Sequence, residues 1–124
     1  MKLVMVQGGA LGFGVGASVS GGVFVISSTP KTKAFVDDKG VYAGPLSWTF
    51  SGGSAPGCAS GTVVGSGTIQ PGSQDMSVEN QAVVLLDDQV SVTFNGTSPG
   101  GNPVSIPGQP VKVVAAGQSS AWAD

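Results

Sequence analysis

The chain lacks the side chains on which most enzyme active sites depend. Its 124 residues include no His, no Arg and a single Cys. Without His there can be no Ser-His-Asp triad and no Cys-His pair. A zinc site needs several Cys or His ligands, and Cys58 is the only candidate. We therefore expect no catalytic, cofactor-binding or metal-binding residues, and the chain is not predicted to be an enzyme.

Charge is also scarce, at 10% of residues, with a net charge of −2. Five scattered lysines are too few for a nucleic-acid surface, which takes most of its affinity from clustered basic groups on phosphates. No apolar run approaches the 18 residues of a membrane span. Low surface charge favours a homo-oligomer or assembly component with protein partners, because interface cores are depleted of charge. The alternative is a monomer kept soluble by Ser, Thr, Gln and Gly.

The few carboxylates do not form a convincing site. Asp37-Asp38 and Asp87-Asp88 are adjacent pairs, and neighbouring strand residues point to opposite faces, which makes them a poor general acid-base pair. Asp87 and Asp88 are the residues that could contribute to a calcium site. The sequence around Asp87 also lacks the spacing of a calcium-binding EF-hand loop. Carboxylates that cap turns are the simpler interpretation.

Glycine is abundant, with 21 residues, and it dominates residues 1–22. From Leu11 to Val19 this segment alternates large apolar residues with small ones, a period of two that favours a strand. We interpret residues 1–22 as a Gly-rich N-terminal arm that packs closely or pairs with another chain. A disordered tail is the alternative.

Residues 23–124 are predicted to form the rest of a single all-β domain of short hairpins. Leu46, Trp48 and Phe50 alternate onto one face, Asp37-Asp38 supplies a turn, and no segment has helical periodicity. Asn95-Gly96 predicts a tight turn, and the Pro/Gly-rich residues 97–110 predict a loop. Val63–Ile69 is expected to be a strand despite two internal glycines.

Two segments of the chain repeat each other. Val36-Asp-Asp-Lys-Gly-Val41 aligns with Val78-Glu-Asn-Gln-Ala-Val83, and both continue into similar strands that end at Gly52 and Gly96. The repeats lie near residues 28–52 and 69–96, with a period of a little over forty residues. Such a period indicates a supersecondary unit whose copies stack. Pro110 to Val113 is a weaker candidate for the start of a third copy.

Large apolar side chains on these strands are predicted to be core or interface anchors. The candidate interface residues are Leu11, Phe13, Val15, Trp48, Phe50 and Phe94.

The paired segments resemble the repeat of PAAR-type proteins, which cap the trimeric spikes of contractile phage tails and type VI secretion systems. Thr29-Pro30 to Val41 and Ile69 to Val90 match that repeat in outline, and the resemblance covers about residues 28–52 and 69–95, under half of the chain. Zinc-bearing members of that family carry three His and a Cys, so the resemblance implies a metal-free relative. It also implies a spike or other virion structural protein as partner, and a location in the virion or a secreted injection apparatus.

Two other functions fit an all-β chain of this composition. One is a capsid or tail decoration protein that adds its Gly-rich arm to a neighbour as a strand. The other is a small extracellular β-sandwich binding module, although the 6% aromatic content is low for a ligand surface.

Overall fold

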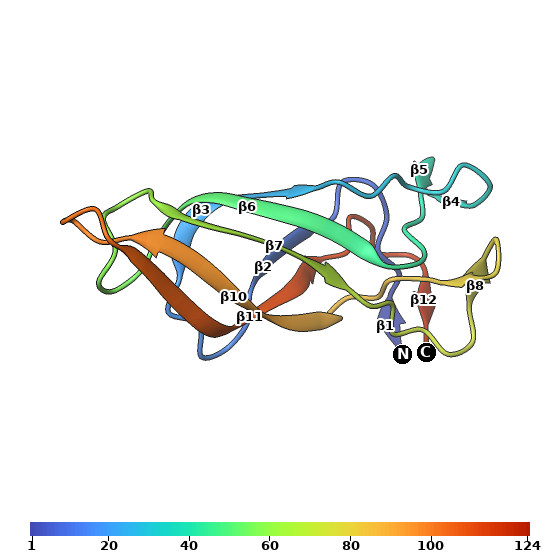
Figure 1. Cartoon of the computed structure of the whole chain (residues 1–124). Helices are drawn as coiled ribbons and strands as arrows, with labels where there is room; N and C mark the ends of the chain where they lie inside the picture. The colour runs from blue at the N-terminus through green and yellow to red at the C-terminus, as the bar shows by residue number, and fades with distance from the viewer.

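The computed structural model describes residues 1–124 as an all-β domain, as the sequence predicted, with long strands in an elongated body and short hairpins at one end (Figure 1). It contains no helix that could cross a membrane. The strands are β1 Lys2–Leu3, β2 Ala10–Phe13, β3 Ser20–Ile26, β4 Phe35–Val36, β5 Lys39–Gly40, β6 Leu46–Ser54, β7 Val63–Ile69, β8 Ser77–Val78, β9 Gln81–Ala82, β10 Gln89–Thr97, β11 Pro103–Ala115 and β12 Trp122–Ala123.

Six strands form the body as one nearly closed antiparallel sheet in the order β2-β11-β10-β7-β6-β3. Two long hairpins, β6/β7 and β10/β11, make up its middle, while β2 and β3 form its two edges. The edges approach each other across the open seam, where the Phe13 and Phe24 ring centroids lie 5.1 Å apart. The sheet therefore curls around its own apolar face and needs no second layer to cover it.

Aromatic rings fill the interior of this sheet. Trp48, Phe50 and Phe94 are buried almost completely, as the alternation along β6 predicted for the first two. Phe13 packs on Phe50 and Phe94 from the opposite edge, at centroid distances of 5.2 and 5.5 Å. The contacts are tilted or edge-to-face, which is the arrangement that aromatic quadrupoles favour.

The end of the body is closed by three short segments that bond to one another in a triangle. Met5 N–H donates to Val84 O (2.8 Å), Val84 N–H to Tyr42 O (3.0 Å) and Tyr42 N–H to Met5 O (3.0 Å). We call these three residues and their immediate neighbours the strand ring. The neighbours are bridged in the same sense around the triangle: Val4 with Leu85, Val6 with Val41, and Ala43 with Val83. The ring therefore has pseudo-three-fold symmetry in its main-chain bonding.

The strand ring separates two apolar clusters. The side chains of Met5, Tyr42 and Val84 belong to the main core of the body. Their neighbours on the ring belong to a second cluster that also takes in Val78 and Ala123 from the short hairpins. Alternation along each ring segment thus ties the short hairpins to the body.

Two sequence predictions are corrected by the structure. Asn95 and Gly96 lie inside β10, and the turn is instead at 98–102, where Ser98 N–H donates to Asn102 O. Gly96 is needed for a close approach, because a Cβ there would lie 2.6 Å from Cys58 Sγ. Most of the predicted loop 97–110 belongs to β11, which accommodates Pro107 at the register shift opposite Val92 and Phe94.

The Gly-rich segment 1–22 packs closely within the domain and does not extend from it (Figure 1). β2 pairs along β11, from Val111 opposite Phe13 to Ala115 opposite Ala10. Gln109, a buried side chain of β11, accepts hydrogen bonds through Oε1 from the amides of Ser18 and Val19. Small residues in this segment let it lie close against β11, as at Gly12, where a Cβ would lie 2.9 Å from the Val114 side chain.

Candidate docking surface

Two short hairpins beside the strand ring have the same geometry, and they are the two copies of the sequence repeat. β4 and β5 are joined by Asp37-Asp38, with φ of 53° and 65°. β8 and β9 are joined by Glu79-Asn80, with φ of 53° and 66°. Left-handed backbone at both central residues defines the type I′ turn that matches strand twist. The alignment of Val36 with Val78 and Val41 with Val83 therefore corresponds to equivalent positions in space.

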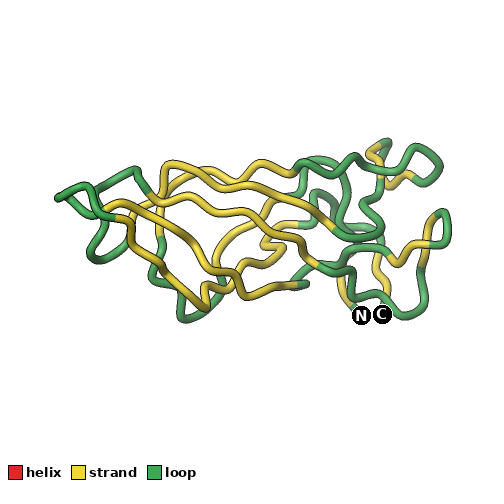
Figure 2. Tube along the Cα trace, in the orientation of Figure 1, coloured by secondary structure: helices red, strands yellow, loops and turns green.

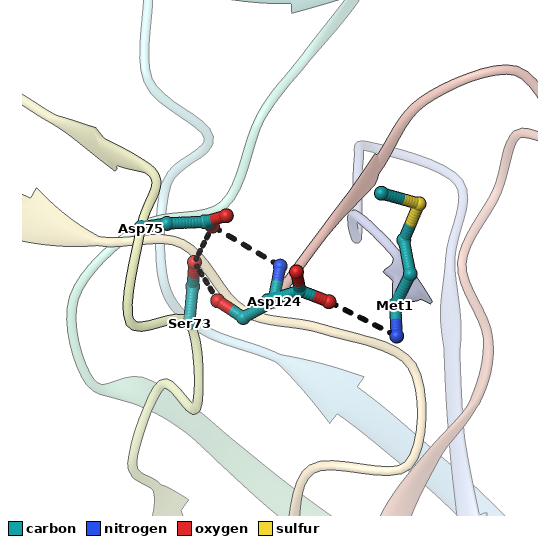
Figure 3. Close-up of polar contacts among 4 residues, drawn as sticks. All are labelled: Met1, Ser73, Asp75 and Asp124. Carbon is teal, nitrogen blue, oxygen red and sulfur yellow. Dashed lines mark hydrogen bonds and ion pairs between the residues drawn. The ribbon is translucent and has the colours of Figure 1, made fainter.

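A third hairpin of the same register is built from the two ends of the chain. Trp122 pairs with Leu3 and Ala123 with Lys2, as Phe35 pairs with Gly40 and Val36 with Lys39 in the first hairpin. Asp124 and Met1 occupy the two turn positions, and the Met1 ammonium lies 3.0 Å from Asp124 Oδ1 (Figure 3). The third copy therefore does not begin at Pro110, which lies within β11.

The three short hairpins are linked to one another around the ring. The first turn residue of each is acidic and contacts the segment that leads into the next hairpin. Asp37 Oδ2 accepts from Ser120 Oγ (3.2 Å), Glu79 Oε2 lies 3.8 Å from Lys31 Nζ, and Asp124 O accepts from Ser73 Oγ (3.0 Å; Figure 3). We call the three short hairpins and the strand ring together the hairpin end.

Charge is concentrated at the hairpin end. Nine of the twelve charged side chains lie on the short hairpins or their lead-in segments: Lys2, Lys31, Lys33, Asp37, Asp38, Lys39, Asp75, Glu79 and Asp124. The other three flank the strand ring, at Asp87, Asp88 and Lys112. Residues 41–74 and 89–111, which form most of the long hairpins, carry no charge. The two ends of the molecule therefore differ in chemistry.

The Asp88 carboxylate caps the local backbone, as the turn-capping interpretation predicted, whereas the Asp87 carboxylate contacts a lysine. Asp88 Oδ2 accepts from the amides of Gly72 and Leu85, both at 2.8 Å. Asp87 adopts a left-handed φ of 72° and lies 3.4 Å from Lys112 Nζ. No cluster of three or more Cys, Asp or Glu in the structure is arranged to hold a metal ion, and the surface has no pocket.

Five of the six candidate interface residues lie inside the body. Trp48, Phe50, Phe94 and Leu11 are buried, and Phe13 is half-buried against the same core. Val15 alone is on the surface, fully exposed in the loop before β3. These residues hold the sheet together, and a docking surface has to be sought elsewhere.

The structure exposes two aromatic side chains that the sequence did not single out. Phe35 on β4 is 60% exposed and Trp122 on β12 is 50% exposed. The face on which Phe35 lies could not be predicted, because the alternation of apolar residues before the Asp37-Asp38 turn is weak. Trp122 was missed because its hairpin partner, Leu3, lies at the other end of the chain.

The remaining titratable group of note is Tyr42, in the strand ring. Burial raises the pKa of its hydroxyl above the ordinary value of 10.0. The neutral hydroxyl is thus favoured, which fits a structural role at the junction of ring and core.

Comparisons of the chain with protein-family models, curated proteins and solved structures give no match.

Proposed function

We propose that this protein is a structural component of a phage virion or contractile injection machine, and that it caps a protein spike as PAAR-like tip proteins do. In this proposal the hairpin end faces the spike and the long hairpins point away from it. The role is that of an assembly part and requires no chemistry at the surface.

The pseudo-three-fold symmetry of the hairpin end carries the proposal. Three hairpins of one register surround three ring segments whose hydrogen bonds run in one direction around a triangle. Two surfaces of the same symmetry can form several equivalent contacts at the same time. A single chain with this end can offer an equivalent hairpin to each subunit of a three-fold partner, whereas a partner without such symmetry would gain nothing from it.

The elongated shape also supports a cap. The short hairpins and both termini gather at one end of the molecule, and the long hairpins extend to the other (Figures 1 and 2). A decoration protein was expected to add its Gly-rich segment to a neighbour as a strand. That alternative is less well supported, because the Gly-rich segment is already paired with β11 of its own chain.

The test is the position and copy number of the chain in intact particles of its source. An epitope inserted between Gly100 and Gly101, in the exposed turn far from the hairpin end, labels the chain without touching the proposed contact. Electron microscopy locates the label, and quantitative mass spectrometry counts copies against the spike protein. We expect one copy per three spike subunits, on the spike axis. Many copies spread over a shell would indicate a decoration protein, and absence from particles would refute the proposal.

A further inference from the structure

Two of the three short hairpins carry an exposed aromatic side chain at matching positions on their outer faces. The equivalent residues are Phe35, Ser77 and Trp122. Each is the first residue of its strand, and each pairs with the second residue after the hairpin turn: Gly40, Ala82 and Leu3. Two of these three positions therefore hold an exposed aromatic ring, in a chain with few aromatics. The third holds a small hydroxyl.

Strand alternation explains why these side chains face solvent. The next residue in each hairpin, Val36, Val78 or Ala123, packs on the apolar cluster beneath the strand ring. The preceding side chain must then point away from that cluster. Apolar residues exposed on the body, such as Val15, lie outside this three-fold arrangement.

An exposed Phe and Trp at symmetric positions are suited to binding a partner and contribute little to the stability of this chain. Aromatic side chains bury 150–250 Å² each, and Trp and Tyr are prominent among the few interface residues that dominate affinity. Neither Phe35 nor Trp122 belongs to the core of this chain or packs against it. The surrounding acidic and basic groups provide the polar rim that such anchors usually have.

We propose that Phe35 and Trp122 are the anchors of the docking surface, and that they insert into two of three identical apolar pockets on a homotrimeric protein. Ser77 covers the third pocket without filling it. This inference rests on the proposed function and adds to it the residues that bind and the apolar pockets that would receive them.

The insertion of two anchors into three identical pockets has two consequences. One copy binds three subunits and can do so in three equivalent orientations, because rotation by a third of a turn presents the same pockets again. An aromatic residue at position 77 would fill the third pocket and strengthen binding.

The experiment measures how much of the chain stays on purified particles after washing at rising urea concentration below the unfolding transition. The variants are Phe35→Ser, Trp122→Ser, the double variant and Ser77→Phe. Val15→Ser is the matched control, since it removes an exposed apolar side chain from the body. Circular dichroism and thermal unfolding of each purified variant establish that it folds.

We expect the double variant to be retained at least about tenfold less than the wild type, each single variant to fall in between, and Val15→Ser to be retained normally. Ser77→Phe is expected to be released more slowly than the wild type. Retention of a folded double variant at the wild-type level would refute the anchors. Release of Ser77→Phe at the wild-type rate or faster would refute the equivalent third pocket. Either result leaves the cap itself in place if the wild type is found on the spike axis. A wild type found elsewhere would instead refute the proposed function.

Discussion

At the scale of single residues, glycines make room for the aromatic core. A Cβ at Gly65 would lie 2.7 Å from Phe94 Cδ2, and a Cβ at Gly67 would lie 2.9 Å from Trp48 Cζ2. Both glycines are on β7, next to the strands that carry the rings. The absence of a side chain on this part of β7 lets large rings lie flat against the backbone, so the weak strand propensity of glycine is offset by packing.

Substitution of Gly65 by Ala tests this arrangement. We expect Gly65→Ala to lower the free energy of unfolding by about 1–3 kcal/mol, because the buried Phe94 ring is enclosed by other rings and has little room to shift. Urea denaturation of the two proteins gives the difference. Gly100→Ala is the matched control: its Cβ would have no neighbour closer than 3.8 Å, and its effect should stay within about 0.5 kcal/mol. Equal effects at the two sites would contradict the packing argument.

The sequence predicted the alternating faces of these strands but could not predict what covers them. Trp48 and Phe50 share a face, as expected, and that face is covered by the curl of their own sheet. Local alternation is the same whether an apolar face meets its own chain or a partner. For the same reason Gly96 was interpreted as a turn residue, although it is required by contact with Cys58, thirty-eight positions away.

At the scale of elements, the short hairpins use turns that are unusual in composition. The favoured type I′ turn has Asn or Asp followed by Gly, but here Asp38 and Asn80 occupy the second central position with positive φ. A non-Gly residue in this conformation costs about 1 kcal/mol, less for Asn or Asp. The strand pairing and the second apolar cluster hold the turns in place in spite of that cost.

Replacing Asp38 with Gly should stabilise the protein. The Asp38 side chain makes no hydrogen bond or ion pair, so Asp38→Gly chiefly relieves the backbone strain, and we expect the free energy of unfolding to rise by about 0.5–1 kcal/mol. Asp38→Ala is the companion variant and should lower stability instead, because Ala lacks the tolerance of Asp for this region. Thermal unfolding of the three proteins provides the measurement. A destabilised Asp38→Gly would mean that the carboxylate has a role of its own.

The hairpin turns were predictable from the sequence because their signals are local. Asp37-Asp38 and Glu79-Asn80 combine turn-forming residues with flanking valines, and their repetition identified two equivalent units. The third hairpin has no such signal, since its two strands are the first and last of the chain. A repeat that is divided in this way leaves no contiguous segment to align.

At the scale of the whole molecule, the fold behaves as a closed cycle of three units that is interrupted in one short hairpin. Each unit contributes a short hairpin, a ring segment and a long excursion into the body, and the N- and C-terminal residues meet where a two-residue turn would be (Figure 1). We therefore expect that the present ends can be joined and the chain opened at another exposed turn.

A circular permutant tests this cycle. Asp124 is joined directly to Met1, and the chain is opened between Gly100 and Gly101. We expect it to fold with an unchanged far-ultraviolet circular dichroism spectrum and a free energy of unfolding within about 2 kcal/mol of the parent, because the new bond completes a turn of the existing register.

The matched control carries the same join but is opened between Tyr42 and Ala43. This cut lies in the strand ring, where the Tyr42 carbonyl accepts from Val84 N–H and Ala43 is bridged to Val83. Because the cut separates two residues that bond the ring together, we expect this permutant not to fold. If both permutants fail, the ends do not have turn geometry; if both fold, the ring is not essential.

The uneven placement of charge means that the two ends of the molecule respond differently to their surroundings. The long hairpins between residues 41–74 and 89–111 have no carboxylate or amine to gain or lose a proton, and nothing on them for salt to screen. The strength of contacts made by these uncharged residues should therefore change little with salt concentration or on mild acidification. Contacts made by the charged opposite end will depend on the ionic strength of the medium, so salt acts on one end of the molecule and leaves the other unaffected.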